Sequence, residues 1–557
     1  MTIRDLRRVS AFVLAGALAA LPARAEDLLL PAAAPAAPAG AAAETGLPTV
    51  DASAPAAPAS PFRAGLERAT AGMAEPERAA ILGFYAARGD APFWAEPGAG
   101  RMAALTAALA SAETHGLPPA RYQVATPADP AGAEVAAMRA WLAFGRDLSS
   151  GALTPSKVDP EIETKPMRPA PGALLAPLAG GDVAAAAAGL APQGADYAAL
   201  LAEKARLEAQ RGEDWGPEAP EGKTLRLGDS GARVAALRAR LAARGHAAPT
   251  PADPAAFDEG LKAALAAFQA EEGLEPDGLA GKRTIAALNA GPEDALKAVL
   301  VNLERARWTN GAFEDRYLHV NIPDYTARLV EGGRTAFATK VVVGKADDTR
   351  TPEFGATMTY LVVNPTWHVP DSIAQRVYLP KLQANPQTLA NSNMRIFTRS
   401  GTEIDPGLVD FTQFQKGNFP FRIKQNPSDA NALGKVKFMF PNQHSIYLHD
   451  TPHRELFAKA ERAYSNGCVR VQNPEALAAI LLEGQVDDPA AAFDGWVAAK
   501  AERTVTLTRP IAVHLDYRTV FLDDAGALQR RFDVYGRDAE VWRALEAAGV
   551  TLPAAEG

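Results

Sequence analysis

The chain has 557 residues, which is too long for one ordinary hydrophobic core and, at roughly 100–200 residues a domain, predicts about three folded units with linkers. Hydrophobic residues make up 48% and charged residues 22%, the composition of a soluble globular protein. With 57 Lys and Arg against 65 Asp and Glu, the net charge of -8 leaves no basic field for a polyanion, so nucleic acid is excluded as a partner.

The first 25 residues have the pattern of a secretory signal peptide. Basic residues open the chain, an apolar run occupies residues 9–21, and a small-residue cleavage site ends at Ala25. The apolar run is shorter than the ~20 residues of a spanning helix, so cleavage is predicted in preference to a membrane anchor. The mature protein is then exported and keeps no stable membrane span.

Composition divides the next part of the chain. Residues 26–61 are almost wholly Ala, Pro, Gly and small polar residues, which cannot offset ordering entropy by burial, so they predict a flexible linker. Residues 62–215 carry Ala and Leu at helical spacing, as in 101–112 and 136–144, and predict a helical scaffold domain. Within it, the Ala, Pro and Gly of residues 169–194 predict a loop.

Residues 222–292 predict a small bundle of three helices. Apolar side chains recur at helical spacing along the first two helices, at Val234, Leu237, Leu241, Leu261, Leu265 and Phe268. A Pro-Asp-Gly turn at 276–278 precedes a third helix near residues 284–288. Many small bundles share such apolar positions, but the turn residues and Phe268 make this segment resemble the peptidoglycan-binding three-helix module.

From residue 301 the hydrophobic period changes to that of strands. Short β-branched or aromatic runs occupy 317–322, 327–330, 337–343, 360–363, 436–440, 446–449, 504–507, 511–516 and 520–522, with a hairpin turn at 331–334. They predict a mainly β domain over residues 300–557. Residues 370–434 are too long for a loop and predict an inserted subdomain of mixed helix and coil. Its ends lie close in sequence to the strands that lead to His449, which is considered below with Cys468 as a candidate site residue. This placement predicts that the subdomain caps the Cys468 site, and the alternative is a static structural insertion.

Cys468 is the only cysteine, and it is the main chemical signal. Exported proteins usually pair their cysteines, so a lone thiol is either a buried, inert side chain or a functional one. His449 ends an apolar run 19 residues earlier and has the chemistry to take the thiol proton. Gly467 permits the close approach of a substrate carbonyl.

These residues, in the order histidine, spacer, Ser-x-Gly-Cys-x-Arg, resemble the catalytic domain of the L,D-transpeptidases. The likeness extends to residues 302–308, 320–323, 343–345, 350–352, 364–367 and 516–517. It implies the large periplasmic branch, a multidomain α+β protein with a helical scaffold, a peptidoglycan-binding module and a mainly β catalytic domain with a capping insertion. One departure is Asn466, where many relatives have a second histidine.

The resemblance implies an activity and roles for individual residues. Cys468 would attack the diaminopimelate carbonyl of a tetrapeptide stem, release D-Ala and pass the acyl group to a second stem, giving a 3-3 crosslink. His449 would act as base and then acid, held by the backbone carbonyl of Asp450. The oxyanion would be stabilised by the amides of Cys468 and Gly467 and by the Tyr447 hydroxyl. Substrate contacts are expected from Arg470, Trp367, Ser465 and Asn466.

The same resemblance implies a periplasmic protein that is a carbapenem target and needs no metal or other cofactor. Its expected partners are peptidoglycan stem peptides, glycan and other cell-wall enzymes. The acyl acceptor stays open, because a protein lysine or a free amino acid is an alternative to a second stem.

Three other interpretations compete with this one. His444, His449 and His453 cluster in sequence and suggest a zinc site, but Pro452 disfavours the helix that such a site requires and the glutamate base is missing. A papain-like protease would place its cysteine far upstream of the histidine. A wall-binding protein with a decayed catalytic domain is opposed by the joint presence of His449, Gly467, Cys468 and Arg470.

Overall fold

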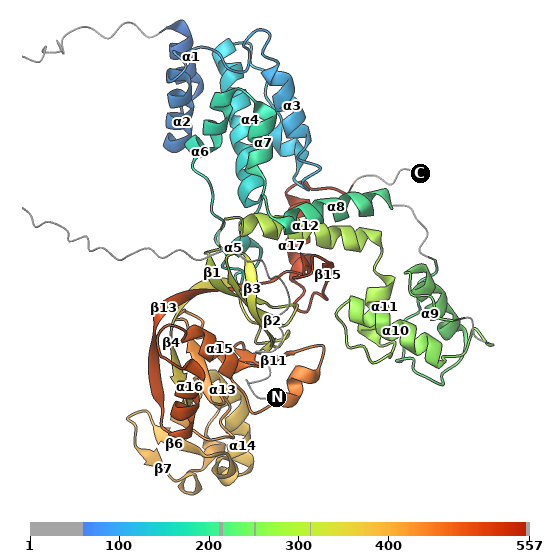
Figure 1. Cartoon of the computed structure of the whole chain (residues 1–557), viewed down its shortest axis with the longest axis vertical. Helices are drawn as coiled ribbons and strands as arrows, with labels where there is room; N and C mark the ends of the chain where they lie inside the picture. Colours follow the sequence, from blue (N-terminus) through green and yellow to red (C-terminus); the bar gives the residue numbers. More distant parts are fainter. Residues whose placement is uncertain (1–59, 211–215, 250–251, 312, 553–557) are drawn as a thin grey trace, which may run out of the picture. The chain divides into compact units, whose positions relative to one another are not determined.

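The computed structural model describes residues 60–210, 216–249, 252–311 and 313–552 (Figure 1). The expected signal peptide, and all but the last two residues of the expected linker, lie outside the described residues. Pro61, the last residue assigned to that linker, already begins helix α1 (Pro61–Ala69), which Ser60 caps by accepting a hydrogen bond from the N–H of Arg63. In the part of the chain that is described, no helix has both the length and the apolar character to cross a membrane.

The N-terminal helices share one hydrophobic core. They are α1, α2 (Glu75–Ala86), α3 (Arg101–Ala110), η2 (Pro119–Tyr122), α4 (Pro130–Ser150), α6 (Pro171–Leu175), η3 (Ala176–Gly180) and α7 (Val183–Leu190). The buried carboxylate of Glu134 in α4 accepts the Tyr85 hydroxyl at 2.5 Å and backbone N–H groups of the turn at residues 93–95 at 2.7–3.0 Å. These bonds tie α2 and the turn after it to α4.

The loop expected at residues 169–194 is wrong. This stretch forms α6, η3 and α7, and its few large side chains, Leu174, Leu175, Leu178 and Val183, are buried in the helical core. The abundant Ala, Pro and Gly concealed these anchors, because tertiary burial outweighed a composition typical of loops.

A second group of helices shares a core with a short β-hairpin near the C-terminus. It comprises α5 (Pro155–Val158), α8 (Ala195–Ala209), α12 (Pro292–Trp308) and α17 (Arg537–Ala547), with the short hairpin β14 (Val520–Leu522) and β15 (Leu528–Arg530). Inside it the fully buried Arg307 pairs with Glu304 at 2.8 Å, and Glu304 also accepts the indole N–H of Trp308 at 2.9 Å. A buried charge needs such partners to offset its lost hydration.

Helices α9 (Ala232–Ala243), α10 (Glu259–Glu271) and α11 (Lys282–Asn289) form the expected three-helix bundle with its own core. The predicted apolar positions are buried, and Asp258 caps α10 by accepting the N–H of Leu261 at 2.7 Å. Gln269 holds the turn before α11, since its amide bonds Asp277, Gly278 and Thr284.

The C-terminal region is built on a nine-stranded sheet in the order β11-β3-β12-β10-β9-β4-β13-β1-β2, in which β2 also pairs with β3. Its strands are β1 (Arg316–Asn321), β2 (Thr326–Glu331), β3 (Arg334–Gly344), β4 (Phe354–Val363), β9 (Val436–Met439), β10 (Leu448–His449), β11 (Ala463–Ser465), β12 (Val469–Val471) and β13 (Arg503–Asp516). The runs predicted at 504–507 and 511–516 are one strand, β13, with an irregularity between Thr506 and Ile511.

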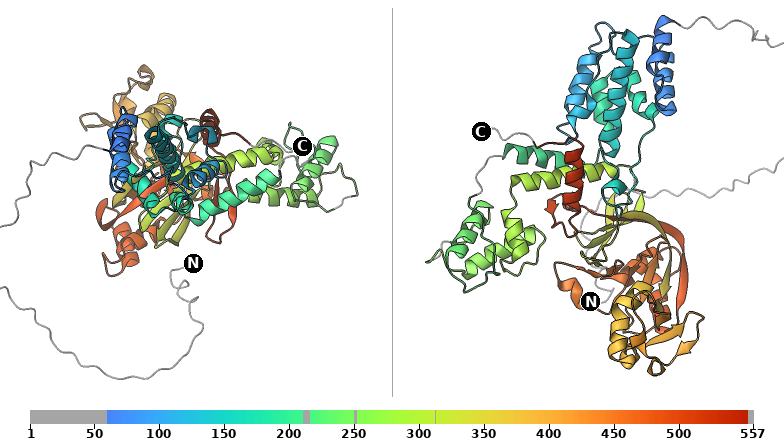
Figure 2. Two further views of the ribbon diagram at one scale, coloured as in Figure 1. Left: turned by 90° about the horizontal axis from the view of Figure 1, so that it is seen from above. Right: turned by 180° about the vertical axis from the view of Figure 1, so that it is seen from behind.

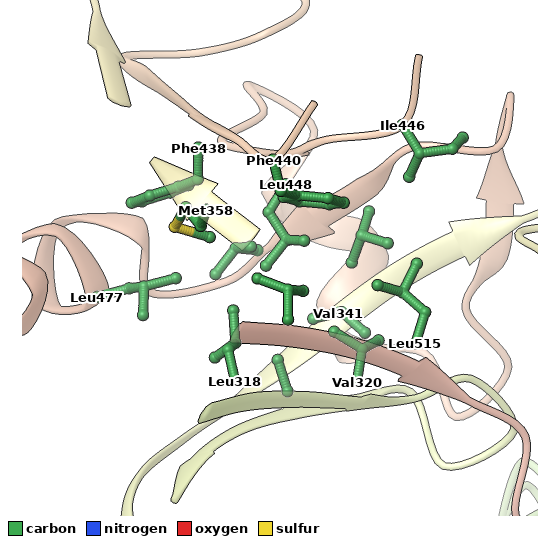
Figure 3. Packing of buried hydrophobic residues seen from close by; sticks show 14 of the residues in the cluster. Leu318, Val320, Val341, Met358, Phe438, Phe440, Ile446, Leu448, Leu477 and Leu515 are labelled. Carbon is green, nitrogen blue, oxygen red and sulfur yellow. The ribbon is translucent and has the colours of Figure 1, made fainter. Parts of the chain in front are cut away.

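Alternating side chains of these strands fill the core of the sheet (Figure 3). Leu318 and Val320 of β1, Val341 of β3 and Leu448 of β10 are fully buried there. Helices α15 (Pro474–Leu481) and α16 (Pro489–Ala498) add Leu477 and other apolar side chains to the same core; Figure 2 gives two further views of the sheet and its helices.

Residues 370–434 form an inserted subdomain with a core of its own. Its elements are α13 (Asp371–Ile373), the π-helical turn η4 (Ala374–Tyr378), α14 (Leu379–Ala384), η5 (Pro386–Ser392), β6 (Met394–Thr398), β7 (Glu403–Ile404), η6 (Pro406–Leu408), η7 (Phe411–Gln413) and β8 (Phe421–Gln425). Strands β6, β7 and β8 join β5 (Trp367–His368) in a small antiparallel sheet, which the expectation of helix and coil did not include.

Both ends of the insertion lie beside strand β10, which carries His449, as the sequence predicts. The N–H of Asn364 donates to the carbonyl of Lys435 at 2.8 Å, and the N–H of Lys435 donates to the Asp450 carboxylate at 2.8 Å. The two ends are thus held together next to residue 450.

Candidate active site

Strands β10 and β12 are parallel neighbours, and their register decides which side chains meet. Leu448 pairs with Val469, and His449 pairs with Arg470. Leu448 and Val469 belong to the core of the sheet. Because side chains alternate along a strand, the opposite face collects Tyr447, His449, Cys468 and Arg470.

His449 is 5% exposed, and its Nδ1 lies 2.5 Å from the backbone oxygen of Asp450. A carbonyl oxygen only accepts, so Nδ1 carries the ring proton and Nε2 of the neutral imidazole is left to accept one. Burial, with the positive charges of Arg470 and Lys437, lowers the pKa of His449 to about 3, against the opposing effect of the Asp450 carbonyl. The ring is therefore neutral at neutral pH.

Cys468 is half-buried, and its thiol donates to the Ser445 carbonyl, with Sγ 3.8 Å from that oxygen. Burial raises the pKa of the Cys468 thiol to about 11, although hydrogen bonds from the Tyr447 backbone and hydroxyl, and the charge of Arg470, act in the other direction. The resting thiol is therefore protonated, and a base is needed to make it a nucleophile.

Two residues expected at the substrate are engaged in supporting the turn before Cys468. The N–H of Gly467 donates to Ser465 Oγ at 3.1 Å, and Ser465 Oγ donates to the Cys468 carbonyl at 2.5 Å. Ser465 is only 2% exposed. In this structure the Gly467 amide and Ser465 Oγ bond each other in the buried turn, so the contacts expected of them with an oxyanion and with substrate stay predictions.

The backbone conformation at position 467 explains why this residue is glycine. Its φ is +109°, a region that side chains with a Cβ rarely adopt, and a Cβ there would lie 3.1 Å from Ile446 Cδ1. The next amide, that of Cys468, has no hydrogen-bond acceptor among the described residues. The turn therefore leaves the N–H of Cys468 open, next to the thiol.

Trp367 is expected to contact substrate, but its side chain is largely buried in this structure. It is 9% exposed in the core of the insertion, where its ring meets that of Tyr378 with centroids 6.2 Å apart. Its side chain lies close enough to the Tyr447 hydroxyl, and that hydroxyl close enough to Cys468, for each group to affect the ionisation of the next. Trp367 therefore supports Tyr447, and Tyr447 contacts the nucleophile.

Asn466 is exposed, but its side chain is held by the insertion. Its Oδ1 accepts from Arg376 of η4 at 2.6 Å, while the other arm of Arg376 pairs with Asp348 at 2.6 Å. The expected substrate contact of Asn466 is therefore replaced by a contact between the insertion and the residue two positions before the nucleophile. No sequence motif pointed to Arg376.

Two cations lie on the catalytic face. The buried Nε of Arg470 has no hydrogen-bond partner among the described residues, and burial lowers the pKa of its guanidinium. Lys437 of β9 lies opposite His449 in the register of β9 and β10. Its Nζ is 5.9 Å from the centre of the Tyr447 ring, and burial lowers the pKa of Lys437. Sequence analysis did not single out Lys437, although its alternation with buried Val436 and Phe438 places it on this face.

The three histidines of the rejected zinc site have separate partners. His444 Nε2 pairs with Glu163 at 2.9 Å, His453 pairs with Glu455 at 3.4 Å, and His449 bonds the Asp450 carbonyl. Across the described residues, no group of His, Cys, Asp and Glu side chains has the arrangement of a metal site.

Three segments of the chain match known families. Residues 79–203 match the "Scaffold domain", residues 230–288 the "Putative peptidoglycan binding domain", and residues 315–489 the "L,D-transpeptidase catalytic domain". Among curated proteins, the "Putative L,D-transpeptidase" of Haemophilus influenzae is 33% identical over 253 residues, which is 43% of this chain and 48% of that protein. The aligned part thus spans about half the length of this relative.

Solved structures give weaker likenesses. The L,D-transpeptidase of Xylanimonas cellulosilytica is 15% identical, covers 54% of this chain and all of its own, and has a TM-score of 0.15. That of Stackebrandtia nassauensis is 14% identical, covers 54% and 98% of the two chains, and has a TM-score of 0.19. The domain matches identify what the chain contains: an L,D-transpeptidase catalytic domain, which includes His449 and Cys468, together with a peptidoglycan-binding domain.

Proposed function

We propose that this protein is a periplasmic L,D-transpeptidase that joins peptidoglycan stem peptides through an acyl-enzyme on Cys468. The observation that carries the proposal is the single thiol beside Tyr447 and on the same face as His449, within the matched catalytic domain. The donor is a tetrapeptide stem and the acceptor is the side-chain amine of another stem, so the product is a 3-3 crosslink.

His449 moves the proton in both halves of the reaction. As the thiol attacks the diaminopimelate carbonyl, its proton passes to the free Nε2 of His449. The carbon–nitrogen bond to D-Ala then breaks, D-Ala leaves with that proton on its amine, and a thioester remains. In the second half the acceptor amine attacks the thioester, its proton passes through Nε2 to sulfur, and the amide product leaves.

The developing oxyanion needs donors, and two are available. The open N–H of Cys468 is one, and the Tyr447 hydroxyl, which contacts Cys468, is the other. Arg470 has a buried Nε without a partner, which suits a stem carboxylate, because a charge-assisted bond would satisfy it.

The remaining segments fit this activity in the following way. Residues 1–25 export the chain, residues 26–61 separate the folded part from the export signal, and residues 62–215 form the scaffold. Residues 222–292 bind peptidoglycan, residues 300–557 form the catalytic domain, and residues 370–434 cap Cys468. The supports are the expected signal pattern, the matched segments and the bond from Arg376 to Asn466. Stem peptides, glycan and other cell-wall enzymes are the proposed partners.

The deciding experiment is the muropeptide profile of cells that lack the protein and are complemented with wild type, Cys468→Ala or His449→Ala. Wild type restores 3-3 crosslinks and both variants fail to, because they remove chemistry and leave the folded sheet intact. In parallel, a carbapenem should add its mass to the purified wild type and not to Cys468→Ala. Crosslinks formed by Cys468→Ala would contradict the proposal, and acylation without crosslinks would favour a lysine or amino-acid acceptor.

A further inference from the structure

A short acidic segment, residues 159–163, follows α5 and lies along the start of β4. The N–H of Glu353 donates to the carbonyl of Glu161, and the N–H of Glu163 donates to the carbonyl of Glu353, both at 2.8 Å. Ile162 is fully buried on one side. Because side chains alternate in extended backbone, Glu161 and Glu163 are directed to the other side, toward the catalytic domain.

The first part of the segment holds two arginines. Glu161 pairs with Arg350 at 2.8 Å and with the fully buried Arg537 at 2.9 Å, and Asp159 lies 3.4 Å from each of them. Arg537 also pairs with Glu353 at 3.0 Å. A buried guanidinium is costly without such partners, so this network fixes the position of Arg350 and its neighbours.

The neighbours of Arg350 support the turn that carries the nucleophile. Thr349 Oγ1 donates to the carbonyl of Ser465 at 3.0 Å, and Thr351 Oγ1 donates to the carbonyl of Gly467 at 2.8 Å. The bonded carbonyls belong to residues one and three positions before Cys468. The Glu161 contacts therefore reach Cys468 through one loop.

The last residue of the segment holds a second loop. Glu163 Oε1 accepts from Gln443 Nε2 at 2.5 Å and lies 2.9 Å from His444 Nε2. The next residue, Ser445, has a φ of +55°, uncommon for a residue other than glycine, and its carbonyl is the group that faces Cys468 Sγ. Glu163 therefore reaches Cys468 from the other side.

We infer that residues 159–163 are a positioning element of the active site, which holds the loops at 349–351 and 443–445 so that Cys468 is aligned for acylation. The inference rests on the proposed function, and it assigns a role to a segment outside the matched catalytic domain. Alignment of a nucleophile is sensitive to such support, since a displacement of about 1 Å can cost ~100-fold in rate.

The test compares Glu163→Ala with Glu163→Gln. The alanine variant removes both contacts to the second loop, while the glutamine variant keeps an oxygen that accepts from Gln443. The control is Glu67→Gln, which alters an ion pair on the surface of α1; the Glu67 side chain is 46% exposed and that of Glu163 is 27% exposed. Each protein is first shown to be folded by its thermal unfolding, and Glu161→Gln serves as the second variant if Glu163→Ala fails to fold.

Two rates are then measured on the single thiol, acylation by a carbapenem and alkylation by iodoacetamide across pH. In Glu163→Ala, acylation should slow about tenfold or more, because the attacking geometry is lost. Alkylation near pH 7 should become faster, because the Ser445 carbonyl no longer favours the protonated thiol. Opposite changes in the two rates are not expected of a variant that is only less stable. Glu163→Gln and Glu67→Gln should stay close to wild type.

A folded Glu163→Ala protein with both rates unchanged would overturn the inference. The same holds if Glu67→Gln slows acylation as much as Glu163→Ala does. Failure of the wild type to be acylated at all would count against the proposed function, whereas the alkylation profiles would still report on the positioning of Cys468.

Discussion

The most direct physical prediction for this site concerns the protonation of the resting Cys468 thiol. Because the pKa of Cys468 is raised to about 11, about one thiol in ten thousand is ionised at pH 7, against about one in a hundred for a thiol at the ordinary value of 9.0. The chain has one cysteine, so iodoacetamide followed by intact mass reports this thiol alone. At pH 7 the folded protein should be alkylated roughly tenfold more slowly than the same protein unfolded in denaturant, because the greater nucleophilicity of the more basic thiolate offsets part of its smaller fraction.

The same assay separates the groups that act on the thiol. Tyr447→Phe removes a hydroxyl whose hydrogen bond lowers the pKa of Cys468, so the variant should be alkylated more slowly still, with its midpoint shifted to higher pH. Tyr317→Phe, at a half-buried tyrosine of β1, is the control and should match wild type. A folded-state midpoint below 9, or equal profiles for wild type and Tyr447→Phe, would refute this account of the site.

Three further predictions concern acid, the small bundle and the insertion. Since the folded pKa of His449 is about 3 and the ordinary value is 6.5, acid protonates this ring only in the unfolded chain, so stability falls below pH 6.5, by about 2 kcal/mol at pH 5; thermal unfolding of His449→Gln should show a shallower loss. Deleting residues 222–292 should weaken sedimentation with purified sacculi and leave carbapenem acylation intact, and a folded deletion protein that is not acylated would place the bundle in the active site. Hydrogen exchange should quicken in residues 370–434 of Arg376→Ala, which loses the bonds to Asn466 and Asp348, and slow in wild type once Cys468 is acylated; unchanged exchange in both cases would defeat the capping role.

Much of the fold was predictable because its signals are local. Strands β1 to β4 and β9 have alternating or β-branched runs, and the three-helix bundle has its periodic apolar face and its turn residues. The multidomain α+β class and the likeness to L,D-transpeptidases are confirmed by the architecture and the matched segments. Cys468 and His449 stand out in the sequence because a lone thiol is unusual in a chain expected to be exported, and the histidine lies 19 residues before it.

What sequence could not supply were pairings over long separations and the direction of single hydrogen bonds. Glu163 contacts His444, which lies 281 positions away in the sequence, and neither segment has a sequence pattern that predicts this contact. The resemblance to L,D-transpeptidases implies that the Gly467 amide faces an oxyanion, whereas in this structure its N–H donates to Ser465 Oγ. Such choices depend on which donor and acceptor are buried together, and burial is a property of the folded chain.

The protonation states of the Cys468 thiol and the His449 imidazole also bear on why several groups are needed to align Cys468. A protonated Cys468 on the same face as a neutral His449 is poorly reactive toward oxidants, since the thiolate is the species that is oxidised, and this suits a lone thiol in the compartment that we propose. Because the thiol is protonated at rest, almost no thiolate is present before substrate binds. In the reaction that we propose, the proton moves as the carbon–sulfur bond forms, so the rate depends on the alignment of Sγ, Nε2 and the open N–H of Cys468 at that moment. We therefore expect the groups that align Cys468, including Tyr447 and residues 159–163, to influence acylation more than they influence the stability of the fold.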